Sequence, residues 1–151
     1  MIKIIKNGDI FDSKCQTITN AINTVGIMGA GIALAFKNRF PEMYSHYKTG
    51  CTKGLVKVGH PYIYKESPQR WILNFPTKDH YKDDSSKEFV TDGLKFIASK
   101  YKNSGIKSLA LPALGCGLGN LNPQWVYDEI HAILADVEIP IDLYWDFKTN
   151  E

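Results

Sequence analysis

The sequence predicts an α/β sandwich built on a largely parallel central sheet, and it predicts a single domain. Short apolar runs typical of strands alternate with longer segments in which apolar residues recur every three or four positions, as in helices. The chain has 151 residues, of which 44% are hydrophobic and 23% charged. This length and composition allow one domain, residues 1–151, to bury a core of its own.

Six strands are predicted from apolar runs that end at turn-forming residues. Strands that alternate with helices tend to pair in parallel, and ligands of such sheets bind beyond the carboxyl ends of the strands. A binding site is therefore expected in the loops that follow the strands. The predicted strands cover residues 2–5, 17–23, 61–64, 71–75, 108–114 and 141–147.

Four helices are predicted between these strands. Pro41 occupies a favourable first helical position, and Asn122 is placed to cap the last helix. Gly93 lowers helix propensity inside an otherwise well-patterned segment. The predicted helices cover residues 30–39, 41–49 and 86–102, the last with an apolar stripe of Val90, Leu94, Ile97 and Tyr101, and a fourth starts at Pro123 and carries Val126, Ile130 and Ile133.

Composition narrows the class of protein. The net charge of +2 is too small to indicate nucleic-acid binding by itself. The three cysteines, Cys15, Cys51 and Cys116, are scattered without CxxC spacing, so neither disulfides nor a metal site is expected, and no cofactor is predicted. No apolar stretch approaches the length of a signal peptide core or a membrane span. A cytoplasmic protein without membrane contact is expected.

A glycine-rich turn, NTVGIMGAGIALAF, lies between a predicted strand and a predicted helix. Such turns often hold phosphate, because the backbone approaches the ligand closely and the helix N-terminus presents free N–H groups. The GxxGxG order differs from the GxGxxG of dinucleotide folds, and Ile32 and Ala33 stand where a P-loop needs lysine and a hydroxyl. A kinase or NTPase is therefore not indicated. The glycines of this turn are Gly26, Gly29 and Gly31.

A second glycine-rich turn, LALPALGCGLGN, follows another apolar strand and precedes the helix at Pro123. Neither turn contains a carboxylate, so an anion there would meet N–H groups only. Two facing cradles suit a pyrophosphate; the alternative is two tight turns that allow close helix packing. The glycines of the second turn are Gly115, Gly117 and Gly119.

Two further stretches place polar side chains after strands. WILNFPTKDHYK brings Asn74, Thr77, Lys78 and His80 to a carboxyl end, where Lys78 is either a solvated loop residue or poised over a pocket. The neighbouring His80 and Tyr81 are compatible with an ordinary surface pair. Asp9, directly after the first strand, either caps the next turn or accepts a hydrogen bond from an exocyclic amine such as that of adenine.

These motifs together resemble the macrodomain family, whose members are ADP-ribose-binding three-layer α/β/α modules. The resemblance rests on NGDI, TNAIN with the first glycine-rich turn, and LPALGCGL, and it covers essentially the whole chain. The motifs NTVGIMGAGIALAFKNRFP, NFPTKDHY and LPALGCGLG are most similar to the DarG-type branch of antitoxins. Members of that branch remove ADP-ribose from thymidine in DNA, and the wider branch includes terminal ADP-ribose protein glycohydrolases.

The resemblance implies a role for each motif. The diphosphate of ADP-ribose would lie between the two glycine-rich turns. Asp9 would bind the adenine amine with the Ile10 backbone nearby, Asn23 would address the distal ribose, and Lys78 would be the catalytic lysine. The other implied ADP-ribose contacts are Asn20, Met28, Thr77, Leu114, Cys116 and Leu118.

The chemistry implied for Lys78 has two forms. Cleavage at the anomeric carbon of the distal ribose develops positive charge there. A deprotonated amine can attack that carbon covalently, whereas a charged lysine can stabilise a departing anion. Protein-directed relatives carry an aspartate where this chain has Gly119, so His80 is the candidate replacement for their acid. A thymine imide and a glutamate carboxylate are both stable leaving anions, so the missing acid does not name the substrate.

The resemblance also implies partners. Single-stranded DNA carrying ADP-ribose on thymidine is the expected substrate, and a cognate DNA ADP-ribosyltransferase toxin is an expected partner of a monomeric protein. The chain is expected to be the macrodomain and little else, as a stand-alone antitoxin, a phage counter-defence protein or a housekeeping eraser. The alternatives are a reader that binds ADP-ribose without turnover and a hydrolase of glutamate-linked mono-ADP-ribose on proteins.

Overall fold

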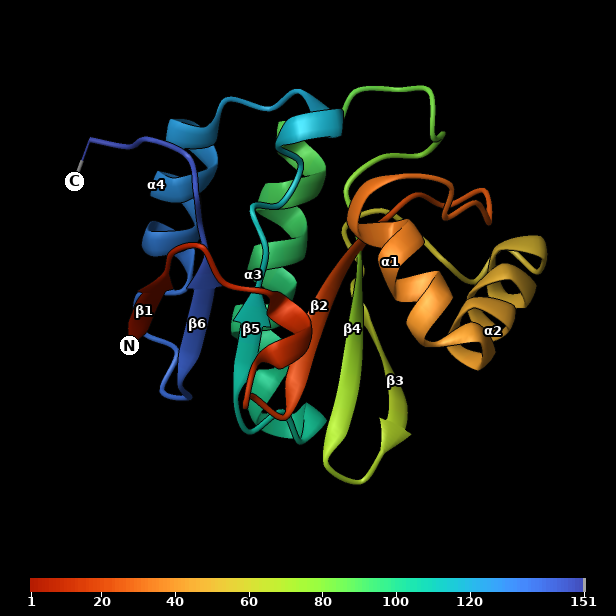
Figure 1. Cartoon of the computed structure of the whole chain (residues 1–151), viewed down its shortest axis with the longest axis horizontal. Coiled ribbons are helices and arrows are strands. Elements are labelled where there is room, and N and C mark those ends of the chain that lie inside the picture. Colours follow the sequence, from red (N-terminus) through yellow and green to blue (C-terminus); the bar gives the residue numbers. More distant parts are fainter. Residues whose placement is uncertain (151) are drawn as a thin grey trace.

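The computed structural model describes residues 1–150 and contains one six-stranded sheet in the order β1-β6-β5-β2-β4-β3 (Figure 1). All neighbouring strands run parallel except β3, which is antiparallel to β4. The sheet is therefore mixed and largely parallel, as the sequence predicts. The strands are β1 (Ile2–Ile5), β2 (Thr17–Ile22), β3 (Tyr62–Ser67), β4 (Arg70–Pro76), β5 (Leu109–Leu111) and β6 (Ile141–Tyr144).

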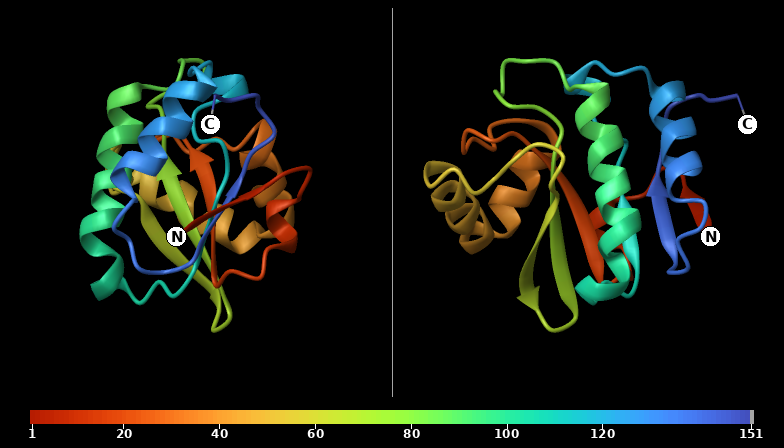
Figure 2. Two further views of the ribbon diagram at one scale, coloured as in Figure 1. Left: turned by 90° about the vertical axis from the view of Figure 1, so that its left-hand side faces the viewer. Right: turned by 180° about the vertical axis from the view of Figure 1, so that it is seen from behind.

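Helices cover both faces of the sheet and make three layers (Figure 2). One buried cluster joins α3 and α4 to one face, and a second joins α1, α2 and η1 to the other. The predicted three-layer sandwich is confirmed. The helices are α1 (Gly31–Arg39), α2 (Pro41–Thr52), α3 (Lys87–Ser104) and α4 (Pro123–Ile133), with short 3-10 helices η1 (Ile10–Asp12) and η2 (Gly117–Gly119).

The helix ends and faces follow from local chemistry. The Asn122 side chain accepts hydrogen bonds from the backbone N–H groups of Gln124 and Trp125, so it caps α4 as predicted. The predicted apolar stripe of α3 is buried against the sheet. Gly93 has a packing reason, since a Cβ there would collide with the Phe75 ring of β4. The missing side chain allows close helix–sheet contact and compensates its low helix propensity.

Three strands end earlier than predicted, β2 by one residue and β5 and β6 by three each, and both 3-10 helices are absent from the prediction. β5 stops at Leu111, because Pro112 has no N–H with which to continue the ladder. β6 stops at Tyr144, although the Trp145 N–H still donates to the Ile5 oxygen of β1 at 2.9 Å. The residues released from these strands form loops at the carboxyl edge, where the parallel strands end (Figure 1).

None of the helices in residues 1–150 is both long enough and apolar enough to cross a membrane.

Candidate functional site

A cleft of about 690 Å³ lies at the carboxyl edge of the sheet. Three segments form its walls: the first glycine-rich loop (residues 23–31), the second glycine-rich loop (residues 112–119) and the lysine loop (residues 77–86). The structure therefore brings together motifs that are far apart in the sequence. The predicted site residues on the wall are Asn23, Gly29, Gly31, Thr77, Lys78, Gly115, Cys116, Gly117, Leu118 and Gly119.

Other predicted contacts do not lie on the cleft wall. Asn20, Met28 and Leu114 are at most 1% exposed and belong to the packed interior. The Asn20 amide donates to Asn74 Oδ1 at 3.2 Å, which ties β2 to β4. These three side chains point into the protein interior and support the cleft loops by packing, without facing the cleft. Gly26 is also off the wall, and its backbone oxygen accepts from the Tyr44 hydroxyl at 3.2 Å.

Asn23 determines the shape of the first glycine-rich loop. Its Oδ1 accepts from the backbone N–H of Val25 at 3.1 Å and of Ile27 at 3.4 Å, and its Nδ2 donates to the Ile27 oxygen at 2.7 Å. The Tyr47 hydroxyl lies 2.7 Å from the same Oδ1. Burial raises the pKa of Tyr47 above its ordinary value, so its hydroxyl remains a donor. One N–H of the Asn23 amide is left for a ligand in the cleft.

The α1 N-terminus opens onto the cleft without a side-chain cap. Ala30 precedes the helix and makes no side-chain capping hydrogen bond, and the first turn contains no acidic residue. Gly31, Ile32 and Ala33 all lie on the cleft wall. Free N–H groups at a helix N-terminus attract anions, since the helix dipole is positive there. This end of the cleft suits a phosphate group.

Gly29 has no structural reason within the protein to be a glycine. Its φ is not in the left-handed region, and a Cβ would meet only Ile27 Cγ2 at an ordinary 3.5 Å. It nevertheless lies on the cleft wall, next to the α1 N-terminus. A side chain at this position would fill cleft space rather than protein space, so the glycine keeps room for a ligand.

The second glycine-rich loop is closed by backbone hydrogen bonds. Asn120 N–H donates to the Gly117 oxygen at 3.0 Å, and Leu121 N–H donates to the Gly115 oxygen at 2.9 Å. The φ values of 75° at Gly115 and 65° at Gly117 are left-handed, a conformation that favours glycine. A Cβ on Gly31 would lie 3.1 Å from Leu118 Cδ1, so the two glycine-rich loops approach each other across the cleft.

Gly119, where the resemblance places a missing aspartate, is packed against Ser85. A Cβ at position 119 would collide with Ser85 Oγ and lie 3.0 Å from Ser85 Cβ. The Ser85 hydroxyl donates to Thr77 Oγ1 at 3.1 Å, and both residues line the cleft. A hydroxyl pair therefore occupies the space that a side chain at position 119 would need.

Lys78 provides the one charged side chain on the cleft wall within residues 1–150. It is half-buried, and both ion pairs in that part of the chain join other side chains. The lysine loop is attached on each side. Thr24 N–H donates to the Asp79 oxygen at 3.0 Å, and Ser85 N–H donates to the Gly119 oxygen at 2.9 Å. These bonds hold Lys78 between the two glycine-rich loops.

His80 does not line the cleft. Its Nδ1 accepts from the Lys82 N–H at 3.1 Å, and its ring packs on Tyr81 with a centroid distance of 4.3 Å. The predicted acid is therefore directed into its own loop, while the neighbouring Tyr81 lies on the cleft wall. Tyr81 is a site residue that the sequence left as an ordinary surface ring.

Cys116 lies on the cleft wall as a neutral thiol. Burial raises its pKa from the ordinary 9.0 to about 11. A nucleophilic cysteine needs a lowered pKa, so this thiol contributes packing rather than attack at neutral pH. Within residues 1–150, no group of three or more His, Cys, Asp or Glu side chains is arranged to hold a metal ion.

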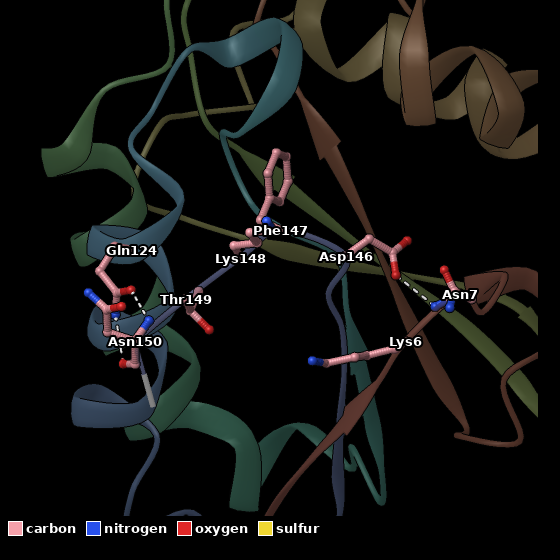
Figure 3. Close-up of a pocket in the computed structure, with 8 residues that line it drawn as sticks. All are labelled: Lys6, Asn7, Gln124, Asp146, Phe147, Lys148, Thr149 and Asn150. Atoms are coloured by element: carbon pink, nitrogen blue, oxygen red, sulfur yellow. Dashed lines mark hydrogen bonds between the residues drawn. The ribbon is translucent and has the colours of Figure 1, made fainter.

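Phe147 marks the far end of the cleft and also borders a second hollow of about 740 Å³ (Figure 3). Across that hollow the Asn7 N–H donates to Asp146 Oδ1 at 2.6 Å. Asp9 lies outside both hollows. Its Oδ1 accepts from Phe11 N–H at 2.9 Å, so it caps η1, the simpler of its two predicted roles.

Phe147 is 40% exposed although it is a large aromatic side chain. The sequence prediction placed it at the end of the last strand, residues 141–147, and gave it no role in the site. Its position at the end of that strand was the available signal, because the parallel strands end at the site. An exposed aromatic ring at a cleft edge is suited to stacking on a planar ligand group.

Comparison with known proteins decides the family. The profile described as "Macro domain" matches residues 19–129. The chain belongs to the macrodomain family. It is 39% identical, over 95% of its length, to the "DNA ADP-ribosyl transferase-DNA ADP-ribosyl glycohydrolase fusion protein" of Thermosipho africanus.

Solved macrodomains share this fold closely. The structure superposes on "Macrodomain of Thermus aquaticus DarG" with a TM-score of 0.90 and 35% identity, covering 96% of this chain and 98% of that one. It superposes on "Thermosipho africanus DarTG in complex with ADP-ribose" with a TM-score of 0.91 and 42% identity, covering 95% of this chain and 41% of that one. The chain spans about two fifths of the length of the DNA ADP-ribosyl glycohydrolases it matches, 43% in the fusion protein and 39% in the Thermus aquaticus protein.

Proposed function

We propose that this macrodomain is a DarG-type ADP-ribosyl glycohydrolase that removes ADP-ribose from thymidine in single-stranded DNA. The observation that carries the proposal is the position of Lys78 on one cleft wall together with both glycine-rich loops. The loops offer backbone N–H groups to a diphosphate, and the lysine is the group able to act on the sugar beyond it. The similarity to proteins named for DNA ADP-ribosyl glycohydrolase activity supports the DNA substrate.

We infer one orientation of ADP-ribose in the cleft. The adenine stacks on Phe147 at the far end of the cleft. The diphosphate lies between Gly29 and the second glycine-rich loop. The distal ribose then reaches the free N–H of Asn23 and the Lys78 ammonium or amine.

The reaction breaks the bond between the anomeric carbon of the distal ribose and the thymine nitrogen. Electrons of that bond leave with thymine as an imide anion, and positive charge develops on the sugar. Lys78 either adds its amine to that carbon or, as an ammonium, stabilises the anion. Water then completes hydrolysis. The cleft wall contains no carboxylate or histidine within residues 1–150, which suits a leaving group that departs without protonation.

A side-by-side assay tests the proposal. Wild-type protein should release ADP-ribose from a thymidine-modified single-stranded oligonucleotide faster than from an ADP-ribosylated glutamate peptide. Lys78→Ala should lower the rate at least about 100-fold, while ADP-ribose affinity stays within several-fold of wild type. Lys78→Arg separates the two roles, because an arginine keeps the charge but is no nucleophile.

The same assay decides between the alternatives. Tight ADP-ribose binding without release from either conjugate identifies a reader. Rapid cleavage of the peptide with an untouched oligonucleotide identifies a protein-directed hydrolase. Cleavage of the oligonucleotide should slow as salt rises, since contacts to DNA phosphates release counterions.

The partners follow from this substrate. A DNA ADP-ribosyltransferase toxin must supply the modified thymidine, so we propose such a toxin as the cognate partner of a monomeric domain. Acting on DNA places the reaction in the compartment that holds the DNA, which is the cytoplasm in bacteria. Light scattering of the purified domain, alone and mixed with a candidate toxin, measures both associations.

A further inference from the structure

We propose that Tyr81, supported by His80, is a stacking platform for the nucleobase that carries ADP-ribose, and that it makes the domain selective for DNA. The inference rests on the proposed function and adds the part of the site that recognises the DNA rather than the ADP-ribose. Four observations carry it: exposed apolar side chains around the cleft, the geometry of the two rings, their attachment to the site, and the local charge.

The exposed apolar side chains of the molecule gather at the cleft. Within residues 1–150, four of the seven large exposed ones lie on its wall and Val25 belongs to the adjoining loop. ADP-ribose has one aromatic group, the adenine, which Phe147 serves. The remaining exposed apolar side chains on the wall suit a second apolar or aromatic group. The four on the wall are Ile27, Tyr81, Leu118 and Phe147.

Tyr81 is presented as a flat, supported surface. Its side chain is 42% exposed, and its ring lies on the His80 ring at a centroid distance of 4.3 Å and an interplanar angle of 30°. The backbone N–H of His80 donates to Asp83 Oδ2 at 3.3 Å, and the ring Nδ1 of His80 accepts from the backbone N–H of Lys82. The histidine thus supports the Tyr81 ring, which remains 42% exposed on the cleft wall.

This surface is attached to the reacting end of the cleft. Tyr81 is three residues from Lys78, and both lie on the wall. Thr24 donates through its N–H and hydroxyl to Asp79, which ties the lysine loop to the loop of Val25 and Ile27. A group bonded to the anomeric carbon beside Lys78 would therefore emerge next to the Tyr81 ring.

The charges at this end favour a nucleic acid. The Lys82 ammonium lies 5.8 Å from the centre of the Tyr81 ring, and it has no carboxylate partner within residues 1–150. The nearby acids are engaged in hydrogen bonds: Asp79 with Thr24, Asp83 with the His80 N–H, and Asp84 Oδ1 with Asn120 at 2.8 Å. A base on Tyr81 would place its flanking phosphate near the unpaired lysine.

A nucleobase fits this surface better than a glutamate side chain does. Every base has a π-face, and stacking on an aromatic ring in single-stranded complexes contributes about 1–3 kcal/mol per base. A glutamate linked to ADP-ribose is a neutral ester with no ring to stack on Tyr81. The platform therefore distinguishes the two conjugates by their aglycone, while the rest of the cleft binds ADP-ribose in either.

The test measures binding in the catalytically disabled Lys78→Ala protein, with free ADP-ribose, the thymidine-modified oligonucleotide and the glutamate-linked peptide as probes. Tyr81→Ala should weaken the oligonucleotide about tenfold and leave ADP-ribose and the peptide within about twofold. Tyr81→Phe keeps the ring and should bind like the parent.

The chain provides a matched control. Tyr64 pairs with His46 at a centroid distance of 5.3 Å on β3 and α2, away from the cleft wall. Tyr64→Ala removes a similar ring pair and should leave all three affinities unchanged. Equal weakening of ADP-ribose and the oligonucleotide by Tyr81→Ala, or of neither, would overturn the platform.

Failure of the platform and failure of the proposed function give different results. Wild-type protein that cleaves the oligonucleotide, together with a Tyr81→Ala variant of unchanged affinity and kcat/KM, overturns the platform and leaves the function standing. Wild-type protein that does not cleave the oligonucleotide, together with selective loss of its binding in Tyr81→Ala, supports the platform and removes the glycohydrolase proposal.

Discussion

The two glycine-rich loops face the same cleft but are shaped in different ways. The first is held by side chains: Asn23 makes four contacts, and Tyr44 and Tyr47 reach it from α2. The second is held by its own backbone hydrogen bonds, by left-handed glycines and by contact with Ser85. The first loop is thus sensitive to loss of polar groups, and the second to gain of side-chain volume.

This difference shows that a glycine can be present for three separate reasons. Gly117 permits a left-handed backbone, Gly119 permits close approach of Ser85, and Gly29 meets neither need. The first two reasons are internal to the protein and concern folding. The third concerns the ligand, so substitutions at the three positions should separate stability from binding.

The largest expected effect is on binding at Gly29. Gly29→Val should weaken ADP-ribose about 100-fold or more, because its side chain would take the space of the diphosphate. Its thermal midpoint should stay near that of wild type, since a Cβ there meets only Ile27 at 3.5 Å. Calorimetry with ADP-ribose and a thermal melt measure the two quantities. Unchanged affinity would remove the diphosphate cradle.

Asn23→Ala tests the side-chain support of the first loop. It should lower the free energy of unfolding by about 2 kcal/mol, because the Tyr47 hydroxyl and the Val25 N–H lose a buried partner. ADP-ribose affinity should fall as well. Urea denaturation gives the stability change, and Asn23→Asp separates the two halves of the amide, because it keeps Oδ1 but loses the donor to the Ile27 oxygen. A stability equal to wild type would show that the loop is held in another way.

Gly119→Ala tests the packing of the second loop. The methyl group should cost about 1–2 kcal/mol by overpacking against Ser85. Ser85→Gly removes both atoms that the methyl group would approach, so the double variant should recover most of the loss. Denaturation of the two single variants and the double variant measures the coupling. Simple additivity of the two changes would contradict the contact.

The smallest expected effect is a difference in alkaline stability. Burial favours the neutral forms of Cys116 and Tyr47, so both contribute stability below their ordinary pKa values and lose it as pH rises. The Cys116 contribution should fade between about pH 9 and pH 11, and that of Tyr47 only above its ordinary pKa of 10.0. Thermal melts of wild type, Cys116→Ala and Tyr47→Phe across this range should show a flatter pH profile in each variant.

The helix positions of this protein and the edge of the sheet that carries the site could be predicted from the sequence alone. Pro41, Asn122 and the α3 stripe marked their helices because capping, φ restriction and periodicity act within a few residues. The alternation of elements predicted a parallel sheet with its site at the carboxyl edge. That edge is where Lys78 and the glycine-rich loops meet.

Only the tertiary structure decided which way each side chain points and which residues distant in sequence it contacts. Asn20, Met28 and Leu114 were predicted to touch the ligand but face the interior, and His80 faces its own loop, while Tyr81 and Phe147 line the cleft. Neighbours in sequence alternate between faces, and a turn redirects them again, so a motif indicates a location but not which side chain points inward. The Gly119–Ser85 contact likewise joins residues 34 positions apart, which no local pattern reports.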